Sequence, residues 1–204
     1  MKMYHIPTGL LHVNSYFLVN EQNEAIVIDP GENYKQIKQT EIKYGFSIKA
    51  VLLTHAHFDH SGIAKKLQDD GAKIYISKID ALKLLNDDNL ASDFGRKFEY
   101  VTADYTFNDG ELLKVCGIDV KVIATPGHTD GSCTYLVENM LFTGDTLFLE
   151  SVGRTDFRTG DKAQLIQSVK KLYKLPGDYQ VFPGHDDFTT LEHERKYNLF
   201  VDYD

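Results

Sequence analysis

Short runs of apolar residues alternate along this chain with turns that are rich in Gly, Pro, Asn and Asp. Short apolar runs between turn residues predict β-strands, whereas apolar residues at helical spacing predict helices. The predicted strands cover residues 15–19, 25–28, 50–53, 73–76, 120–124, 134–137, 140–142 and 180–182. The predicted helices cover residues 34–44, 63–67, 163–175 and 189–200, the last with Leu191, Tyr197 and Phe200 as its apolar stripe. This mixture predicts a layered α/β fold, and with no linker-like segment we expect residues 1–204 to form a single domain.

Four of the predicted strands end at a turn and then present a histidine or an aspartate. A rigid strand followed by a turn can aim such a side chain from the edge of a sheet. The four segments are Thr54-His55-Ala56-His57-Phe58-Asp59-His60, Thr125-Pro126-Gly127-His128, Thr143-Gly144-Asp145 and Pro183-Gly184-His185. Their shared chemistry predicts a metal site at the ends of these strands.

The segment from His55 to His60 carries the strongest of these signals. In an extended or turning segment, His55, His57 and Asp59 can lie on one side while His60 points elsewhere. Neutral imidazole and ionised carboxylate groups suit zinc, iron and manganese. The alternative is a polar loop with solvated histidines, but it does not explain why the same residue types recur after three later strands.

The segment 54–60, followed in order by His128, Asp145 and His185, resembles the metallo-β-lactamase superfamily, and Asp29-Pro30-Gly31 matches an early element of that family. The resemblance covers nearly the whole chain. It implies a four-layered αββα sandwich with two divalent metal ions at one edge of the sheets, and we expect zinc, with iron or manganese as alternatives. It also implies a division of the ligands. His55, His57 and His128 would hold the first ion, Asp59, His60 and His185 the second, and Asp145 would bridge them.

Within that superfamily, the stretch Ser151-Val152-Gly153-Arg154-Thr155-Asp156-Phe157 is similar to one found in glyoxalase II-like thioester hydrolases and in persulfide dioxygenases. Only 19 residues follow His185 in this 204-residue sequence, enough for about one helix. We therefore do not expect the helical domain that helps to hold glutathione in full-length glyoxalase II. The nearer resemblance is to the short, single-domain glyoxalase II-like proteins of bacteria.

The resemblance implies a metal-dependent hydrolase that cleaves a small thioester, a hydroxyacyl-thiol, with a metal-activated water. Two alternatives stay open. One is a persulfide dioxygenase with a single iron ion held by His55, His128 and Asp145, since two histidines and one carboxylate suffice for such a site. The other is a metal-binding protein without catalytic activity, which the complete set of seven ligand positions disfavours.

Three residues receive more specific predictions. Asp59 is the predicted catalytic residue, because a carboxylate beside the second ion can also orient the attacking water. Phe58 lies inside the predicted metal loop and is expected to line the substrate pocket. Arg154 has two equally weighted interpretations: its planar guanidinium can pair with a substrate carboxylate, or it can form a local ion pair with Asp156.

Composition narrows the setting further. The net charge is −8 and the basic residues are scattered, which argues against a nucleic-acid partner. The first twenty residues have no continuous apolar region of the secretion-signal type, and no apolar run is long enough to cross a bilayer. Two cysteines, Cys116 and Cys133, do not make a disulfide framework. We expect a cytoplasmic protein whose partner is a small molecule, and the sequence does not indicate an oligomeric state.

Overall fold

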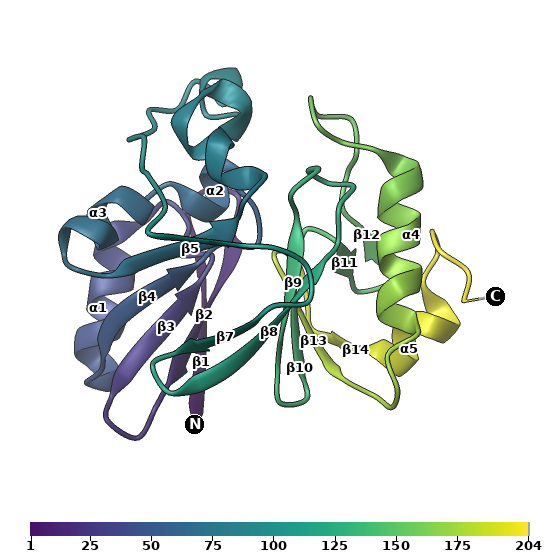
Figure 1. The fold of residues 1–204 in the computed structure, drawn as a ribbon, viewed down its shortest axis with the longest axis horizontal. Helices are drawn as coiled ribbons and strands as arrows, with labels where there is room; N and C mark the ends of the chain where they lie inside the picture. Colours follow the sequence, from purple (N-terminus) through teal and green to yellow (C-terminus); the bar gives the residue numbers. More distant parts are fainter. Residues whose placement is uncertain (204) are drawn as a thin grey trace.

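The computed structural model describes residues 1–203, so the last residue of the predicted domain 1–204 lies outside them. Two six-stranded sheets pack face to face, and helices cover their outer faces (Figure 1). The predicted four-layered αββα sandwich is therefore confirmed. The first sheet contains, in spatial order, β1 (Lys2–Thr8), β2 (Val13–Val19), β3 (Glu24–Ile28), β4 (Ser47–Leu52), β5 (Lys73–Ser77) and β6 (Tyr105–Phe107). The second contains β14 (Thr189–Thr190), β13 (Gln180–Pro183), β10 (Met140–Gly144), β9 (Cys133–Val137), β8 (Ile118–Ala124) and β7 (Leu112–Val115).

Helices and a small hairpin complete the architecture. In Figure 1, α1 and α3 lie outside the first sheet, and α4 and α5 lie outside the second. The hairpin of β11 and β12 extends beside the second sheet. The remaining bounds are α1 (Tyr34–Tyr44), α2 (Phe58–Ser61), α3 (Ala64–Asp69), η1 (Asp80–Leu85), η2 (Asp87–Asn89), η3 (Ser92–Phe94), β11 (Leu147–Phe148), β12 (Ser151–Val152), α4 (Lys162–Tyr173) and α5 (Leu191–Tyr197).

Alternation of side chains along the central strands explains the layering. In β2, Tyr16 and Leu18 face the core between the two sheets, whereas Phe17 and Val19 face the helices. Successive side chains of a strand point to opposite faces, so a strand that is apolar at every position can only be buried on both sides. The outer core of the second sheet is closed by Val169 and Leu172, which pack from α4 against that sheet.

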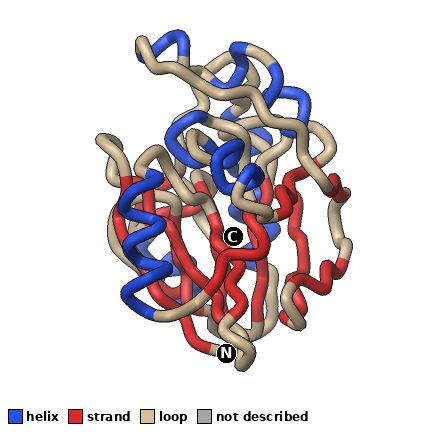
Figure 2. The backbone as a smooth tube through the Cα atoms, turned by 90° about the vertical axis from the view of Figure 1, so that its left-hand side faces the viewer, coloured by secondary structure: helices blue, strands red, loops and turns tan. Residues whose placement is uncertain are grey.

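The strand ends that matter for function lie at one edge. Strands β3, β4 and β5 run parallel to one another, and so do β10 and β13. Since β8 and β10 are both antiparallel to β9, β8 also points the same way as β10. Figure 2 shows short helices and long loops gathered at one end of the strands. The segments that follow β4, β8, β10 and β13 therefore meet there, as the sequence predicted.

Two predictions about elements need correction. The last helix covers only Leu191–Tyr197 and follows the short strand β14, because Thr190 caps it by accepting a hydrogen bond from the His193 amide. Its predicted apolar stripe is wrong: Leu191 is buried, but Tyr197 and Phe200 are 57% and 58% exposed. The sequence also did not predict β1, β6, β7, the two-residue strands β11, β12 and β14, the one-turn helix α2 or the three 3₁₀ helices η1 to η3. Within residues 1–203, no helix is long and apolar enough to span a membrane.

Candidate metal centre

Seven histidine and aspartate side chains converge at this edge. Their candidate ligand atoms fall into three groups, and within each group all atoms lie within 4.8 Å of one another. We call two of these groups the first and the second cluster. The first cluster is His55, His57 and His128, the second is Asp59, His60 and His185, and a third group joins His55 and His60 to Asp145. The structure thus brings all seven predicted positions together.

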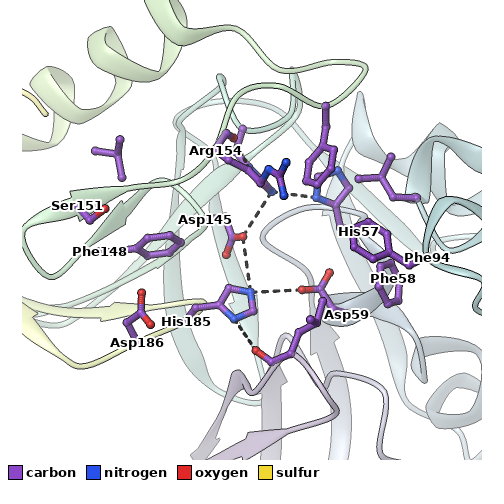
Figure 3. A pocket seen from close by; sticks show the side chains of 15 residues that line it. His57, Phe58, Asp59, Phe94, Asp145, Phe148, Ser151, Arg154, His185 and Asp186 are labelled. Atoms are coloured by element: carbon purple, nitrogen blue, oxygen red, sulfur yellow. Dashed lines mark hydrogen bonds and ion pairs between the residues drawn. The ribbon is translucent and has the colours of Figure 1, made fainter.

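Asp145 lies between the two clusters. Its Oδ2 is 3.4 Å from His128 Nε2 and 3.7 Å from His185 Nε2, and its Oδ1 is 3.3 Å from His60 Nε2. Figure 3 shows His185 between Asp145 and Asp59. The backbone at Gly184 approaches so closely that a Cβ there would lie 2.3 Å from Asp145 Oδ1. Only glycine leaves room for this carboxylate between the clusters.

Hydrogen bonds from the opposite ring nitrogen orient His55 and His60. The Thr54 hydroxyl donates to Asp29 Oδ2 at 2.6 Å, so its oxygen is free to accept from His55 Nδ1 at 3.1 Å. His60 Nδ1 donates to the same Asp29 carboxylate at 2.9 Å. In both rings Nδ1 therefore carries a proton, and Nε2 is the nitrogen directed into the centre, where it can bind a metal ion.

His128 and His185 are oriented in the same way by backbone carbonyls. His128 Nδ1 donates to the Arg154 carbonyl oxygen at 2.7 Å, and His185 Nδ1 donates to the Leu11 carbonyl oxygen at 3.1 Å. Each ring again turns its Nε2 toward the centre. In the first cluster, His57 Nδ1 lies only 2.9 Å from His128 Nε2.

The donor set fits a transition-metal ion. Among the described side chains, His55 Nε2, His60 Nε2 and Asp145 Oδ1 are buried without a hydrogen-bonding partner. Buried polar atoms without a partner are costly, and all three atoms face the centre, where a bound metal ion would give each of them a partner. Imidazole nitrogens with carboxylate oxygens are the usual ligands of zinc and of non-haem iron. The seven side chains together therefore form a metal-binding site of His and Asp residues.

The two clusters differ in their protonation. Burial, followed by the neighbouring histidines, lowers the pKa of His55 and His57 well below the usual value. Burial also lowers the pKa of His60, but Asp145 and Asp59 outweigh it and raise that pKa well above the usual value. His55 and His57 thus offer neutral nitrogen atoms, whereas His60 in the second cluster holds a proton beside the negative carboxylates and must release it to bind a metal ion.

The grouping corrects one expectation from residue spacing. The sequence allowed His55, His57 and Asp59 to lie on one side with His60 apart, yet Asp59 belongs to the second cluster together with His60. The reason is local: α2 begins at Phe58, so the extended spacing of two residues ends before Asp59. The helical turn carries Asp59 away from His57 and toward His185, whose Nε2 is 3.3 Å from Asp59 Oδ2.

A cavity of about 500 Å³ opens directly onto both clusters. Figure 3 shows Phe58 and Phe94 beside His57, with Phe148 and Ser151 on the opposite side. Phe58 and Phe94 lie 5.3 Å apart between ring centroids, and Leu90 packs with Phe58 in a small apolar core. Phe58 therefore lines this cavity, and the wall that it belongs to is largely aromatic; its contact with substrate stays a prediction.

Arg154 also lines this cavity, but its guanidinium is already paired. Its Nε and its terminal nitrogen each donate to Asp156 at 2.6 Å, and its Cζ lies 4.1 Å from the centre of the Phe157 ring. Of the two interpretations weighed from the sequence, the structure shows the local ion pair. The Arg154 backbone contributes separately, through the carbonyl that orients His128.

Two contributions were not predicted. Asp29 was noted only as part of a family element, whereas its carboxylate in fact orients both His60 and, through Thr54, His55. Leu90 directly follows η2 and Phe94 ends η3, in a region where the apolar residues follow neither a strand nor a helix period. Only their apolar character in a polar segment could have signalled them.

The family model of the metallo-beta-lactamase superfamily matches residues 8–185. The chain belongs to the metallo-beta-lactamase superfamily. A probable metallo-hydrolase of Streptococcus pyogenes is 33% identical over 98% of this chain and 90% of its own length. The hydroxyacylglutathione hydrolase GloC of Haemophilus influenzae is also 33% identical, over 98% of each chain.

Solved structures of superfamily members superpose over almost the whole chain. The B3 metallo-beta-lactamase BLEG-1 gives a TM-score of 0.92 at 33% identity, covering 98% of this chain and 99% of its own. TTHA1623, in a di-iron-bound form, gives 0.88 at 30% identity, covering 97% and 100%. ETHE1 from Myxococcus xanthus gives 0.83 at 28% identity, covering 98% and 84%. The di-iron neighbour makes two ions plausible here and leaves the identity of the metal open.

Proposed function

We propose that this superfamily member is a metal-dependent thioesterase of glyoxalase II type that cleaves a small hydroxyacyl thioester. The observation that carries the proposal is the convergence of two His/Asp clusters, joined by Asp145, at the base of a cavity with an aromatic wall. The similarity to a hydroxyacylglutathione hydrolase over 98% of both chains supports this choice of substrate class.

The proposed division of the ligands follows the two clusters. His55, His57 and His128 would hold one divalent ion, Asp59, His60 and His185 would hold the other, and Asp145 would contact both. Zinc is our first choice of metal, with iron or manganese as alternatives. Two such ions, when bound, would lower the pKa of a shared water and polarise the thioester carbonyl.

Asp59 is the proposed catalytic residue. Its Oδ2 lies 3.6 Å from His60 Nε2 and 3.3 Å from His185 Nε2, at the floor of the cavity. The carboxylate can accept a hydrogen bond from the attacking water and so hold its oxygen toward the acyl carbon. When the carbon–sulfur bond breaks, the thiolate leaves without a strong general acid, because a free thiol has a pKa of about 8.5.

Phe58 and Arg154 are the proposed substrate contacts. The Phe58 ring offers an apolar surface next to the reacting centre. The Arg154 guanidinium can reach a substrate carboxylate only if it leaves Asp156, and the pair is solvent-exposed, so its rupture costs little free energy. We therefore assign the acyl group to the aromatic wall and a possible anionic end of the thiol to Arg154.

The second candidate is a persulfide dioxygenase with one iron ion, which the likeness to ETHE1 favours. Such an enzyme would need His55, His128 and Asp145 as ligands. It leaves Asp59, His60 and His185 without a ligand role, although the His60 Nε2 atom is buried and has no hydrogen-bonding partner. For this reason we rank it below the thioesterase.

One experiment separates the candidates. Matched zinc-loaded and iron-loaded samples are tested without oxygen for thiol release from S-lactoyl thioesters, and in an oxygen electrode with glutathione persulfide. A cephalosporin is added to the panel because of the similarity to BLEG-1. We expect the zinc sample to release thiol and neither sample to consume oxygen rapidly. Rapid oxygen consumption confined to the iron sample, with no thioester cleavage in either, would overturn the proposal.

A further inference from the structure

We propose that Asp80 is a positioning residue for the first cluster: it fixes the loop that carries His57 against the loop that carries His128. This inference concerns metal binding and does not depend on which substrate the protein cleaves. Asp80 begins η1 and is fully buried, yet it lies outside the seven ligand positions. An ionised carboxylate without solvent contact must be compensated, so its partners show what it does.

The two partners of Asp80 Oδ2 lie in loops that extend from different sheets. The amide of Ala56 donates to this oxygen at 2.9 Å, and the hydroxyl of Thr129 donates to it at 2.9 Å. Ala56 lies between His55 and His57 after β4, in the first sheet, whereas Thr129 follows His128 between β8 and β9 in the second. A single oxygen atom therefore ties together the two loops that supply the whole first cluster.

A second set of contacts fixes Asp80 itself against the loop that follows His128. The Ser77 hydroxyl donates to the Gly131 carbonyl oxygen at 2.6 Å and accepts a hydrogen bond from the Asp80 amide at 3.1 Å. A Cβ at Gly131 would lie only 2.3 Å from Asp80 Oδ1. The close approach of this loop to the carboxylate therefore requires glycine at position 131.

Lys83 neutralises the buried carboxylate. Its Nζ donates to Asp80 Oδ1 at 2.6 Å and is also hydrogen-bonded to Asp130, which belongs to the same loop as Thr129. The lysine is only 4% exposed. Both carboxylate oxygens of Asp80 thus have partners. Asp80 is connected to residues 129–131 in three ways: directly to Thr129, through Lys83 to Asp130, and through Ser77 to Gly131.

The geometry of the first cluster explains why such a connection is useful. His57 Nδ1 and His128 Nε2 lie 2.9 Å apart, although their loops extend from different sheets. Each histidine is next in sequence to a residue that Asp80 contacts, His57 to Ala56 and His128 to Thr129. This distance fits a hydrogen bond from His57 Nδ1 to His128 Nε2, because His128 Nδ1 already donates to the Arg154 carbonyl, and a metal ion held by both nitrogens would take the place of that proton. A rigid link between their loops holds the pair in place before the metal binds.

The test compares variants that cut the link with a variant that leaves it intact. Thr129→Val keeps the shape of the side chain and removes its hydrogen bonds to Asp80 and to the Ser132 hydroxyl. The double variant Asp80→Ala with Lys83→Met removes the link without leaving a buried, unpaired charge. Thr134→Val is the matched control, because Thr134 is a fully buried threonine on β9 whose hydroxyl faces Thr125 and not Asp80.

Zinc and cobalt affinities are measured by chelator competition, together with the cobalt absorption spectrum and the urea midpoint of the metal-free protein. Loss of a group that positions a metal ligand typically weakens metal binding by 10–100-fold. We expect one of the two ions to bind about tenfold more weakly in Thr129→Val and about 100-fold more weakly in the double variant. The cobalt spectrum of that ion should change, and Thr134→Val should match the wild type.

A purely structural role predicts something different: lower urea midpoints with unchanged metal affinity of the folded chain. That result would overturn the proposal, as would an equal weakening of both ions. If the double variant does not fold, Thr129→Val still decides the question against Thr134→Val. Repeating the titration in a His185→Ala background, which weakens the second cluster, assigns the affected ion to the first cluster. A thioesterase result of either sign leaves this test unaffected, since zinc and cobalt alone are the probes.

Discussion

The two metal clusters face each other across Asp145 but are built in different ways. The first consists of three histidines that are at most 4% exposed and are held by interior contacts. The second combines two histidines with Asp59, and the side chain of its His185 is 20% exposed toward the cavity. The first cluster is therefore suited to hold an ion permanently, while the second combines charge with access to water and substrate.

The difference also appears in what supports each cluster. Asp80, Thr129 and the Arg154 carbonyl support the first cluster from within the protein. Asp29 orients His60 in the second cluster and also, through Thr54, His55 in the first, and the Leu11 carbonyl orients His185. We therefore expect turnover to depend most directly on the second cluster, and the retention of metal to depend most directly on the first.

The substitution Asp59→Asn should have the largest effect on the function of the second cluster. The substitution keeps the size of the side chain but removes the charge that attracts the second ion and orients the water. Turnover should fall at least about 100-fold, which is the typical cost of losing a positioned catalytic group. Asp186→Asn is the control, because Asp186 lines the same cavity outside both clusters. Unchanged turnover of Asp59→Asn, with the far-ultraviolet circular dichroism of both variants intact, would refute the assignment.

Acidification should remove the ion of the second cluster first. In the metal-free protein the pKa of His60 is raised well above its usual value, since Asp145 and Asp59 outweigh the effect of burial, so metal binding must displace a proton. The pKa of His55 and His57 is lowered by burial, so protons do not compete for these two rings at neutral pH. The pKa of His185 is also raised, because Asp145 and the hydrogen bond to Asp59 outweigh burial. As the pH falls below these two raised pKa values, the affinity of the second cluster should fall at least about tenfold per pH unit and more steeply than that of the first.

Metal content after dialysis at a series of pH values between about 8 and about 5 measures this difference. One equivalent should leave at a higher pH than the other. Release of both equivalents in a single step would show that the clusters do not differ in the way proposed.

A smaller effect is expected at the aromatic wall. Phe94→Ala removes a ring that is 45% exposed and lines the cavity, so it should raise KM and leave kcat nearly unchanged. An aromatic contact contributes about 0.5–1.5 kcal/mol, which corresponds to a rise of about twofold to thirteenfold. Phe188→Ala, at a ring that is 44% exposed and packs against Phe182, is the matched control. Equal KM values for the two variants would exclude the wall from substrate binding.

The strand ends could be predicted from sequence because their signals are local. An apolar run, a turn and a ligand follow one another within a few residues, as in the passage from β13 through Gly184 to His185. The resemblance to the superfamily then supplied the assignment of ligands to clusters. Residue spacing alone could not supply this assignment, because α2 begins at Phe58 and turns the Asp59 side chain away from His57.

Other parts of the site depend on contacts between distant segments. Asp80 touches Thr129 across 49 positions of the chain, and neither residue has a neighbour in sequence that indicates this contact. Phe94 reaches the cavity from η3, where the apolar residues lack a regular period. The pairing of Arg154 with Asp156 was one of two equal alternatives, and only the positions of both side chains could decide between them.

The central claim is that one chain holds two metal ions, one in each cluster. The most direct measurement is the metal content of the purified protein after it has been loaded with excess zinc or iron and then desalted. We expect about two equivalents per chain, with His185→Ala retaining about one. A firm ceiling of one equivalent in the wild-type protein would contradict it and would favour the single-iron alternative.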